Sequence, residues 1–237
     1  MDIKSLNLSS RLTISAFCLS VLFGVLYAVM AISVSTTGQL TSIPSLEKVQ
    51  QKYGGILLVS AMKGSMYDEV SDDESIDIVK AWVEAGSPKD VYESKIAGIM
   101  DEDCTSCHSA FSTMTDAMTS MPLTSFDEVL ATTSRGQPWS KLVVETHTHL
   151  FSIGMMLLVL GFMLAHSNIH TWVKNVLILA GFAGLWGDTL FWTMAKFFGF
   201  VGYLIPFTGG LMVGAICAMA GLVFLECWIK VPFISKE

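Results

Sequence analysis

The sequence predicts an all-α membrane protein with four transmembrane helices and a small helical domain inserted between the first and the second. The composition indicates a membrane protein, because 52% of the 237 residues are hydrophobic, only 15% are charged, and the mean hydropathy is +0.56. Ordinary soluble domains carry about 25% charged residues. A single long polar stretch interrupts this apolar chain. The predicted regions are an N-terminal transmembrane anchor at 1–35, a water-soluble domain at 36–140 and a three-helix transmembrane domain at 141–237.

The first apolar run, residues 12–33, is uncharged and long enough to cross a bilayer. Lys4 and Arg11 precede it. A cleavable signal peptide is the alternative, with residues 31–33 as a small-residue cleavage site, but the run is longer than a usual signal core. We therefore expect an uncleaved anchor helix.

Three further apolar runs, at 150–165, 176–195 and 201–228, predict the other spans. The first of these three reaches only about 24 Å as a helix, which is short for a bilayer. We therefore expect the histidines on both sides of it to lie at the water interfaces. These are His147, His149, His166 and His170.

The water-soluble stretch contains two predicted helices. Residues 72–85 can start at a Ser71 or Asp72 cap and end at Gly86 with Pro88, with one apolar face between. That face consists of Ile76, Val79, Trp82 and Val83. The second helix, residues 91–103, leads directly into Cys104.

The segment Cys104-Thr105-Ser106-Cys107-His108 has the spacing by which c-type haem is attached. The two thiols can reach the two vinyl groups of a porphyrin, and His108 then lies under the iron as its proximal ligand. A zinc half-site would need a second ligand pair, and a redox dithiol has no use for the histidine. The remaining cysteines are Cys18, Cys217 and Cys227, each alone in an apolar run. The sequence predicts one covalent haem c and no haem b.

Residues 72–128 resemble the short cytochrome c domains of the planctomycete type. The resemblance rests on Ala81-Trp82-Val83-Glu84-Ala85-Gly86 and on Ile96, Ile99 and Met100, which lead into the Cys-Thr-Ser-Cys-His motif. It implies a compact helical fold wrapped on one porphyrin. It carries no information about the redox partner.

The distal ligand of the iron has two sets of candidates. One set is His147 or His149, near the start of the second span, and the other is Met114, Met118 or Met121, shortly after His108. We favour His147, because the chain joins the haem domain directly to that helix and because a carboxylate, Asp188, lies at a similar depth in the third span. Asp188 would hydrogen-bond the imidazole and fix its tautomer. An open or water-bound position is the remaining possibility.

The basic residues indicate the orientation. With four predicted spans, the same side of the membrane carries Lys4, Arg11, Lys174, Lys230 and Lys236. The positive-inside rule assigns that side to the cytoplasm. The haem domain then faces the periplasm of a bacterial inner membrane. Residues 36–140 hold 16 acidic and 7 basic side chains, a local charge of −9, which excludes nucleic acid as a partner.

These observations predict a membrane-bound monohaem c-type cytochrome that transfers single electrons at the periplasmic face. Its partners would be the quinone pool or other membrane subunits on one side and a periplasmic redox protein on the other. An electron-transfer protein fits better than a stand-alone enzyme. Two alternatives stay open: a quinol-oxidising enzyme that uses His147 and Asp188 as proton acceptors, and a haem-based redox or gas sensor with a displaceable sixth ligand.

Overall fold

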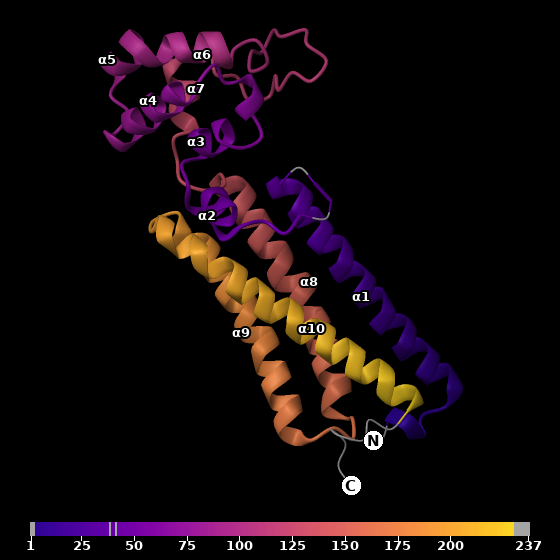
Figure 1. Ribbon diagram of the computed structural model, residues 1–237. Coiled ribbons are helices and arrows are strands. Elements are labelled where there is room, and N and C mark those ends of the chain that lie inside the picture. The colour runs from indigo at the N-terminus through magenta and orange to yellow at the C-terminus, as the bar shows by residue number, and fades with distance from the viewer. Residues whose placement is uncertain (1–2, 38, 41, 230–237) are drawn as a thin grey trace.

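The structure, a computed structural model, describes residues 3–37, 39–40 and 42–229. These residues form helices and loops, with one isolated β-bridge between Ile56 and Arg135. Four helical segments are long and apolar enough to cross a membrane, as the sequence predicts. They contain α1 (Leu8–Thr37), α8 (Trp139–Ala165), α9 (Thr171–Ala195) and α10 (Ile205–Trp228), which pack side by side as a bundle (Figure 1).

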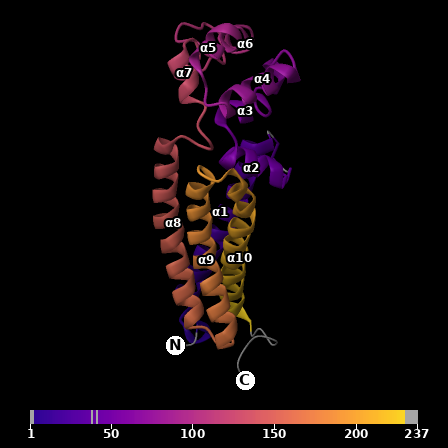
Figure 2. The ribbon, with the colours of Figure 1, turned by 90° about the vertical axis from the view of Figure 1, so that its left-hand side faces the viewer.

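The inserted domain, residues 42–138, lies between α1 and α8 in the chain. Figures 1 and 2 show it at one end of the bundle, with the start of α1 and the end of α10 at the other; we call these the domain end and the terminal end. Its helices are α2 (Leu46–Gly54), α3 (Leu57–Met62), α4 (Asp73–Glu84), α5 (Lys89–Val91), α6 (Ala97–Asp103) and α7 (Phe126–Ala131). Short helical turns are η1 (Ile3–Ser5), η2 (Tyr67–Glu69), η3 (Tyr92–Ile96) and η4 (Gly199–Leu204).

Helix α4 forms where the apolar pattern and its caps predict it. The Asp72 carboxylate accepts a hydrogen bond from the Ser75 N–H at 2.7 Å, and Ile76, Val79 and Trp82 are buried. The helix ends at Gly86, whose φ of 89° is a left-handed conformation that glycine adopts without strain. The second predicted helix is also present, but η3 is a π-helical turn between α5 and α6.

Helix α8 begins at Trp139, before the uncharged run that starts at residue 150. Lys141 and Glu145 lie one turn apart at 3.7 Å and continue the helix toward the inserted domain. With 27 residues, α8 is about 40 Å long. His147 and His149 therefore lie inside this helix and not beyond its end.

A set of polar contacts and close backbone approaches joins the inserted domain to the bundle. The Lys196 ammonium, just after α9, donates to the carbonyls of Arg135 at 2.7 Å and Gln137 at 2.6 Å. The Gln50 amide of α2 donates to the Gly199 carbonyl at 3.2 Å. A Cβ atom on Gly54 would lie 2.3 Å from that same carbonyl oxygen, so only glycine allows this approach. We call these six residues the joint.

Candidate haem-attachment site

The Cys-Thr-Ser-Cys-His motif forms a tight turn at the end of α6. Cys104 caps that helix, and its N–H donates to the Met100 carbonyl at 3.0 Å. The Cys104 carbonyl accepts from the Cys107 N–H at 3.2 Å and from the His108 N–H at 2.8 Å. The turn therefore holds both cysteines and the histidine close together, which attachment of a single porphyrin requires.

The His108 imidazole is buried, with 9% of its surface exposed, and one carbonyl fixes its orientation. Its Nδ1 lies 2.9 Å from the Met121 carbonyl oxygen. A carbonyl oxygen can only accept, so Nδ1 carries the hydrogen and Nε2 keeps its lone pair. This is the tautomer that a metal-binding histidine needs, with the usual hydrogen bond on the opposite ring nitrogen. The Leu123 N–H also donates to the His108 carbonyl at 2.9 Å, which fixes the backbone.

The two motif cysteines are free thiols, each half-buried. Burial, with a smaller contribution from the charge of Asp103, raises the pKa of Cys104 to about 11. Reactive redox dithiols have a lowered thiol pKa. The surroundings of Cys104 therefore differ from those of a redox dithiol. Attachment of haem does not require a low thiol pKa in the resting protein.

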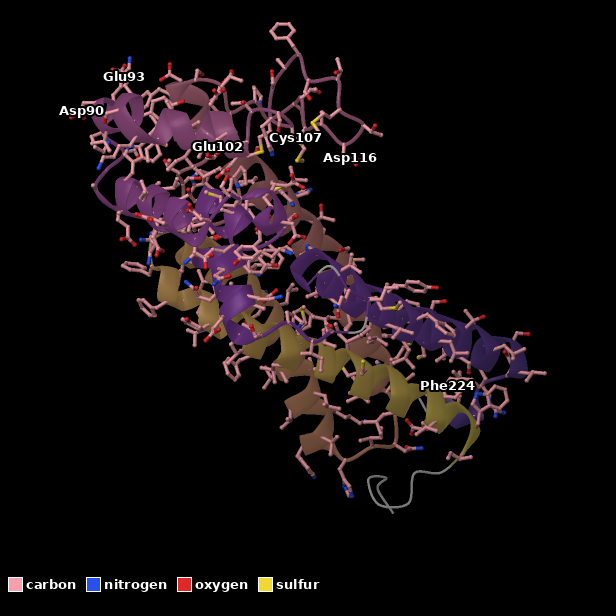
Figure 3. All side chains as sticks on the ribbon, turned by 45° about the horizontal axis from the view of Figure 1, so that its top comes forward. Asp90, Glu93, Glu102, Cys107, Asp116 and Phe224 are labelled. Carbon is pink, nitrogen blue, oxygen red and sulfur yellow. The ribbon has the colours of Figure 1, made fainter. Side chains whose placement is uncertain are left out.

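The loop that follows the motif exposes large apolar side chains. Phe111 is 91% exposed, Met114 55% and Met118 45%. The Cys107 and Met114 sulfurs lie 3.7 Å apart. Figure 3 shows Cys107 at the base of this loop and Asp116 farther along it. Exposed apolar side chains gathered beside a motif indicate a binding surface for an apolar group, and a porphyrin is such a group. The residues present thus fit a haem.

The methionine candidates for the distal ligand lie in this loop, but they are not equivalent. The Met121 carbonyl contacts Nδ1 of His108, on the side of the ring away from Nε2. With a haem bound through Nε2, Met121 would therefore lie on the proximal side. Met118 donates its N–H to the Cys107 carbonyl at 3.1 Å, and Met114 contacts Cys107 through sulfur. Both side chains are free to move, because they are exposed.

The structure does not bring His147 or His149 to the motif. Both lie on α8, which starts beneath the inserted domain, and helices α2 and α3 separate the bundle from the layer of α5 and α6 (Figures 1 and 2). No three His, Cys, Asp or Glu side chains converge as metal ligands in the described parts of the chain. A haem iron needs only one such protein nitrogen on its proximal side.

The two histidines point in different directions. His147 is exposed and lies against the exposed Phe151, with ring centroids 4.8 Å apart, so it does not face the bundle as the predicted bond with Asp188 requires. His149 is half-buried and contacts Trp192 of α9, with ring centroids 5.0 Å apart. Helix α8 packs on the bundle through Leu157, Leu160 and Leu164.

Asp188 is buried in α9, as expected of an intramembrane carboxylate, but it does not face His147. Its Oδ1 accepts from the Thr208 hydroxyl of α10 at 3.5 Å. The Trp192 Nε1–H lies near the carboxylate without reaching hydrogen-bonding geometry, and it is buried with no other partner. The proposed pairing of Asp188 with His147 is therefore corrected.

Tyr53 of α2 lies beside the group formed by His149, Asp188 and Trp192. Its ring stacks on Trp192, with centroids 5.7 Å apart and planes within 13°. Burial raises the pKa of Tyr53, and the charges of Asp188 and Glu145 raise it further, so its hydroxyl stays neutral. We call Tyr53, His149, Asp188, Trp192 and Thr208 the aromatic cluster. Sequence reasoning found only His149 and Asp188, because the other three come from separate elements and carry no local motif.

The fold is that of a helical membrane protein with four candidate spans and a helical insert at one end. Within it, residues 124–232 match a family model described as a transmembrane helical domain. The match covers α7 to α10 and begins after the Cys-Thr-Ser-Cys-His motif. No curated protein and no solved structure matches the chain.

Proposed function

We propose that the chain is a membrane-bound monohaem c-type cytochrome. It holds one haem c covalently through Cys104 and Cys107, with His108 as the proximal ligand. It transfers single electrons at the periplasmic face, between the quinone pool or a membrane partner and a periplasmic redox protein. The observation that carries the proposal is the His108 imidazole, held by the Met121 carbonyl in the tautomer of an iron ligand and next to two free thiols.

The bound haem would supply a one-electron iron couple, and the chain's own residues hold it. Cys104 and Cys107 anchor the porphyrin edge. The Met121 carbonyl keeps the hydrogen on Nδ1 and makes His108 a more basic ligand. With haem bound, the apolar loop of Phe111, Met114 and Met118 would cover part of it and keep water away, which would raise its reduction potential.

For the distal ligand we propose Met114 in place of His147. Its sulfur already lies 3.7 Å from Cys107, and its exposed side chain can swing over the ring without unfolding a helix. Met118 is the second choice, because its backbone is tied to the Cys107 carbonyl. Either methionine would give a higher potential than a second histidine.

The proposed orientation rests on the basic residues of the terminal end. Arg11 lies in the first turn of α1 and stacks on Trp228 at 4.5 Å, and Lys174 lies in the first turn of α9. Both are on the side away from the inserted domain, which supports a cytoplasmic assignment for that end. Lys230 and Lys236 lie outside the described residues. The haem domain then faces the periplasm of a bacterial inner membrane, the side where c haem is attached.

The test is to express the chain together with a bacterial c-haem maturation system and to assay the purified protein by pyridine haemochrome. We expect one haem c per chain that stays on the polypeptide in acid acetone. The Cys104→Ala/Cys107→Ala variant should be colourless, while Cys217→Ala, the control, should keep its haem. Absence of haem from the wild type, or haem that acid acetone extracts, would refute the proposal.

The sensor alternative differs in one measurable property. A sensor needs a displaceable sixth ligand, so its ferrous form would bind carbon monoxide rapidly and tightly. A methionine-ligated electron carrier should bind it weakly or slowly. Carbon monoxide difference spectra of the reduced protein separate these two functions.

A further inference from the structure

We propose that the aromatic cluster is a binding site for the head group of a membrane quinol. The proposal deepens the proposed function, on which it rests for an electron acceptor. It assigns a place on the chain for the quinone partner, at the domain end of the bundle and directly beneath α2. The cluster unites residues of α2, α8, α9 and α10, so no single helix determines it.

The depth of the cluster suits a lipid-soluble ligand with a polar head. His149 lies about 24 Å along α8 from Ala165, and Asp188 about 26 Å along α9 from Thr171. Both helix ends used for this count are at the terminal end. The two side chains are thus nearly level, close to one edge of a hydrocarbon core about 30 Å thick. A quinol head group can reach this level while its tail stays in lipid.

The hydrogen-bonding groups of the cluster complement a quinol. His149 Nδ1 lies 2.8 Å from the Glu145 carbonyl, so it donates there and leaves Nε2 as an acceptor. Asp188 is a second acceptor, with only the long 3.5 Å bond from Thr208. Trp192 is 6% exposed, and its buried Nε1–H has no partner. Two acceptors match the two quinol hydroxyls, and the unpaired donor matches a quinol or quinone oxygen.

The cluster also holds a donor in place for an oxygen of the ligand. The Trp192 Nε1–H lies near Asp188 without reaching hydrogen-bonding geometry, so an oxygen that enters the cluster can accept from it. The nearly parallel ring of Tyr53 stacks on Trp192 and fixes the position of the indole. Since Tyr53 stays neutral, His149 and Asp188 are the proton acceptors of the site.

The redox step balances with one haem per chain. A quinol gives up two electrons and two protons and becomes the quinone. A haem held by Cys104 and Cys107 would supply a one-electron acceptor, so the two electrons would leave one at a time, with reoxidation by the soluble acceptor between them. One proton goes to Nε2 of His149 and the other to the Asp188 carboxylate, and both then leave to water at the domain end.

Binding is tested on the full chain in lipid nanodiscs with a tritium-labelled short-tailed benzoquinol, kept reduced by ascorbate without oxygen, after subtracting the amount taken up by protein-free nanodiscs. We expect saturable binding near one per chain. Trp192→Phe keeps the ring and removes the donor, and Asp188→Asn keeps the shape and removes the charge. Each should weaken binding about tenfold, the equivalent of one lost hydrogen bond of about 1.4 kcal/mol. Trp228→Phe and Glu226→Gln, at the terminal end, are the matched controls and should bind like the wild type.

These outcomes distinguish a failure of the quinol-site proposal from a failure of the haem proposal. The same titration on the haem-free Cys104→Ala/Cys107→Ala chain should give the same affinity, so a failure of the haem proposal leaves this test intact. Absence of saturable binding, or equal affinity in all variants of unchanged melting temperature, would overturn the proposal and leave the cluster a structural contact only. In haem-loaded protein, reduction of the haem by the quinol should slow in Asp188→Asn and not in Glu226→Gln. Equal rates would overturn the electron step.

Discussion

The contact between His108 and the Met121 carbonyl shows what a residue pattern predicts and what it leaves open. The spacing of Cys104, Cys107 and His108 follows from the attachment chemistry, so sequence alone suffices to propose them. The hydrogen-bond partner of His108 lies 13 residues away on a loop with no repeating pattern. Every residue has a backbone carbonyl, so the sequence does not reveal which one accepts the hydrogen bond from His108. The directions of His147 and His149 likewise depend on which face of α8 packs.

The distal ligand can be decided by single substitutions. Met114→Ala should remove the charge-transfer band of methionine-ligated ferric haem, change the low-temperature EPR spectrum and lower the reduction potential, because the iron loses its thioether ligand. Met66→Ala, in the inserted domain but outside this loop, is the matched control and should leave the spectra unchanged. His147→Leu and His149→Leu should also leave the ligand field as it is. A changed spectrum in either histidine variant, with Met114→Ala unaffected, would return the assignment to histidine.

At the scale of elements, helices with local signals were predictable and those set by long-range contacts were not. Helix α4 carries its own cap, apolar face and terminating Gly86, and it forms as predicted. The N-terminal extension of α8 and the packing of α2 depend on partners far away in the chain, such as Tyr53 against Trp192. The π-helical turn η3 has no recognisable sequence signal.

The Asp72 cap makes the stability of the inserted domain depend on pH. The hydrogen bond from the Ser75 N–H lowers the pKa of Asp72 in the folded chain. Its contribution is therefore fully present above the unfolded pKa of about 3.9 and is lost as the pH falls through the lower, folded value. Asp72→Ala should lower the melting temperature at neutral pH, and the difference from wild type should shrink in strong acid.

The control for this prediction is Asp72→Asn, since asparagine also caps helices but does not titrate in this range. It should keep most of the stability at neutral pH and show less change with acid. Calorimetry of the detergent-solubilised chain at several pH values measures all three proteins. A constant deficit of Asp72→Ala across the pH range would contradict the assigned role of the carboxylate.

At the scale of the whole molecule, the joint sets how the inserted domain sits on the bundle. Lys196→Met removes two hydrogen bonds from a charged donor, each worth about 1.5–3 kcal/mol. The segment before α8 should then open more often, and trypsin should cleave after Arg135 faster in the folded protein. Lys95→Met, an exposed lysine of η3 that makes no contact with the joint, is the control. Equal cleavage rates in the two variants would show that Lys196 does not hold this segment.

The charge of the inserted domain should govern its encounters with soluble partners. Residues 36–140 carry a local charge of −9, and Figure 3 shows Asp90, Glu93 and Glu102 along the α5 to α6 run. Stopped-flow reduction by a basic cytochrome should slow as salt rises, whereas reduction by an acidic one should be slow and should accelerate. Equal rates without salt dependence would contradict electrostatic steering.

The joint has a kinetic consequence for the proposed electron carrier. A haem domain on a flexible linker can swing between donor and acceptor, and the length of the linker then limits its turnover. Here Lys196 and Gln50 bind main-chain carbonyls, and Gly54 meets Gly199 with no side chain between. These contacts hold the domain in one position on the bundle, so it does not swing between partners. A soluble partner of the proposed carrier would have to diffuse to it, so turnover should rise with the concentration of that partner.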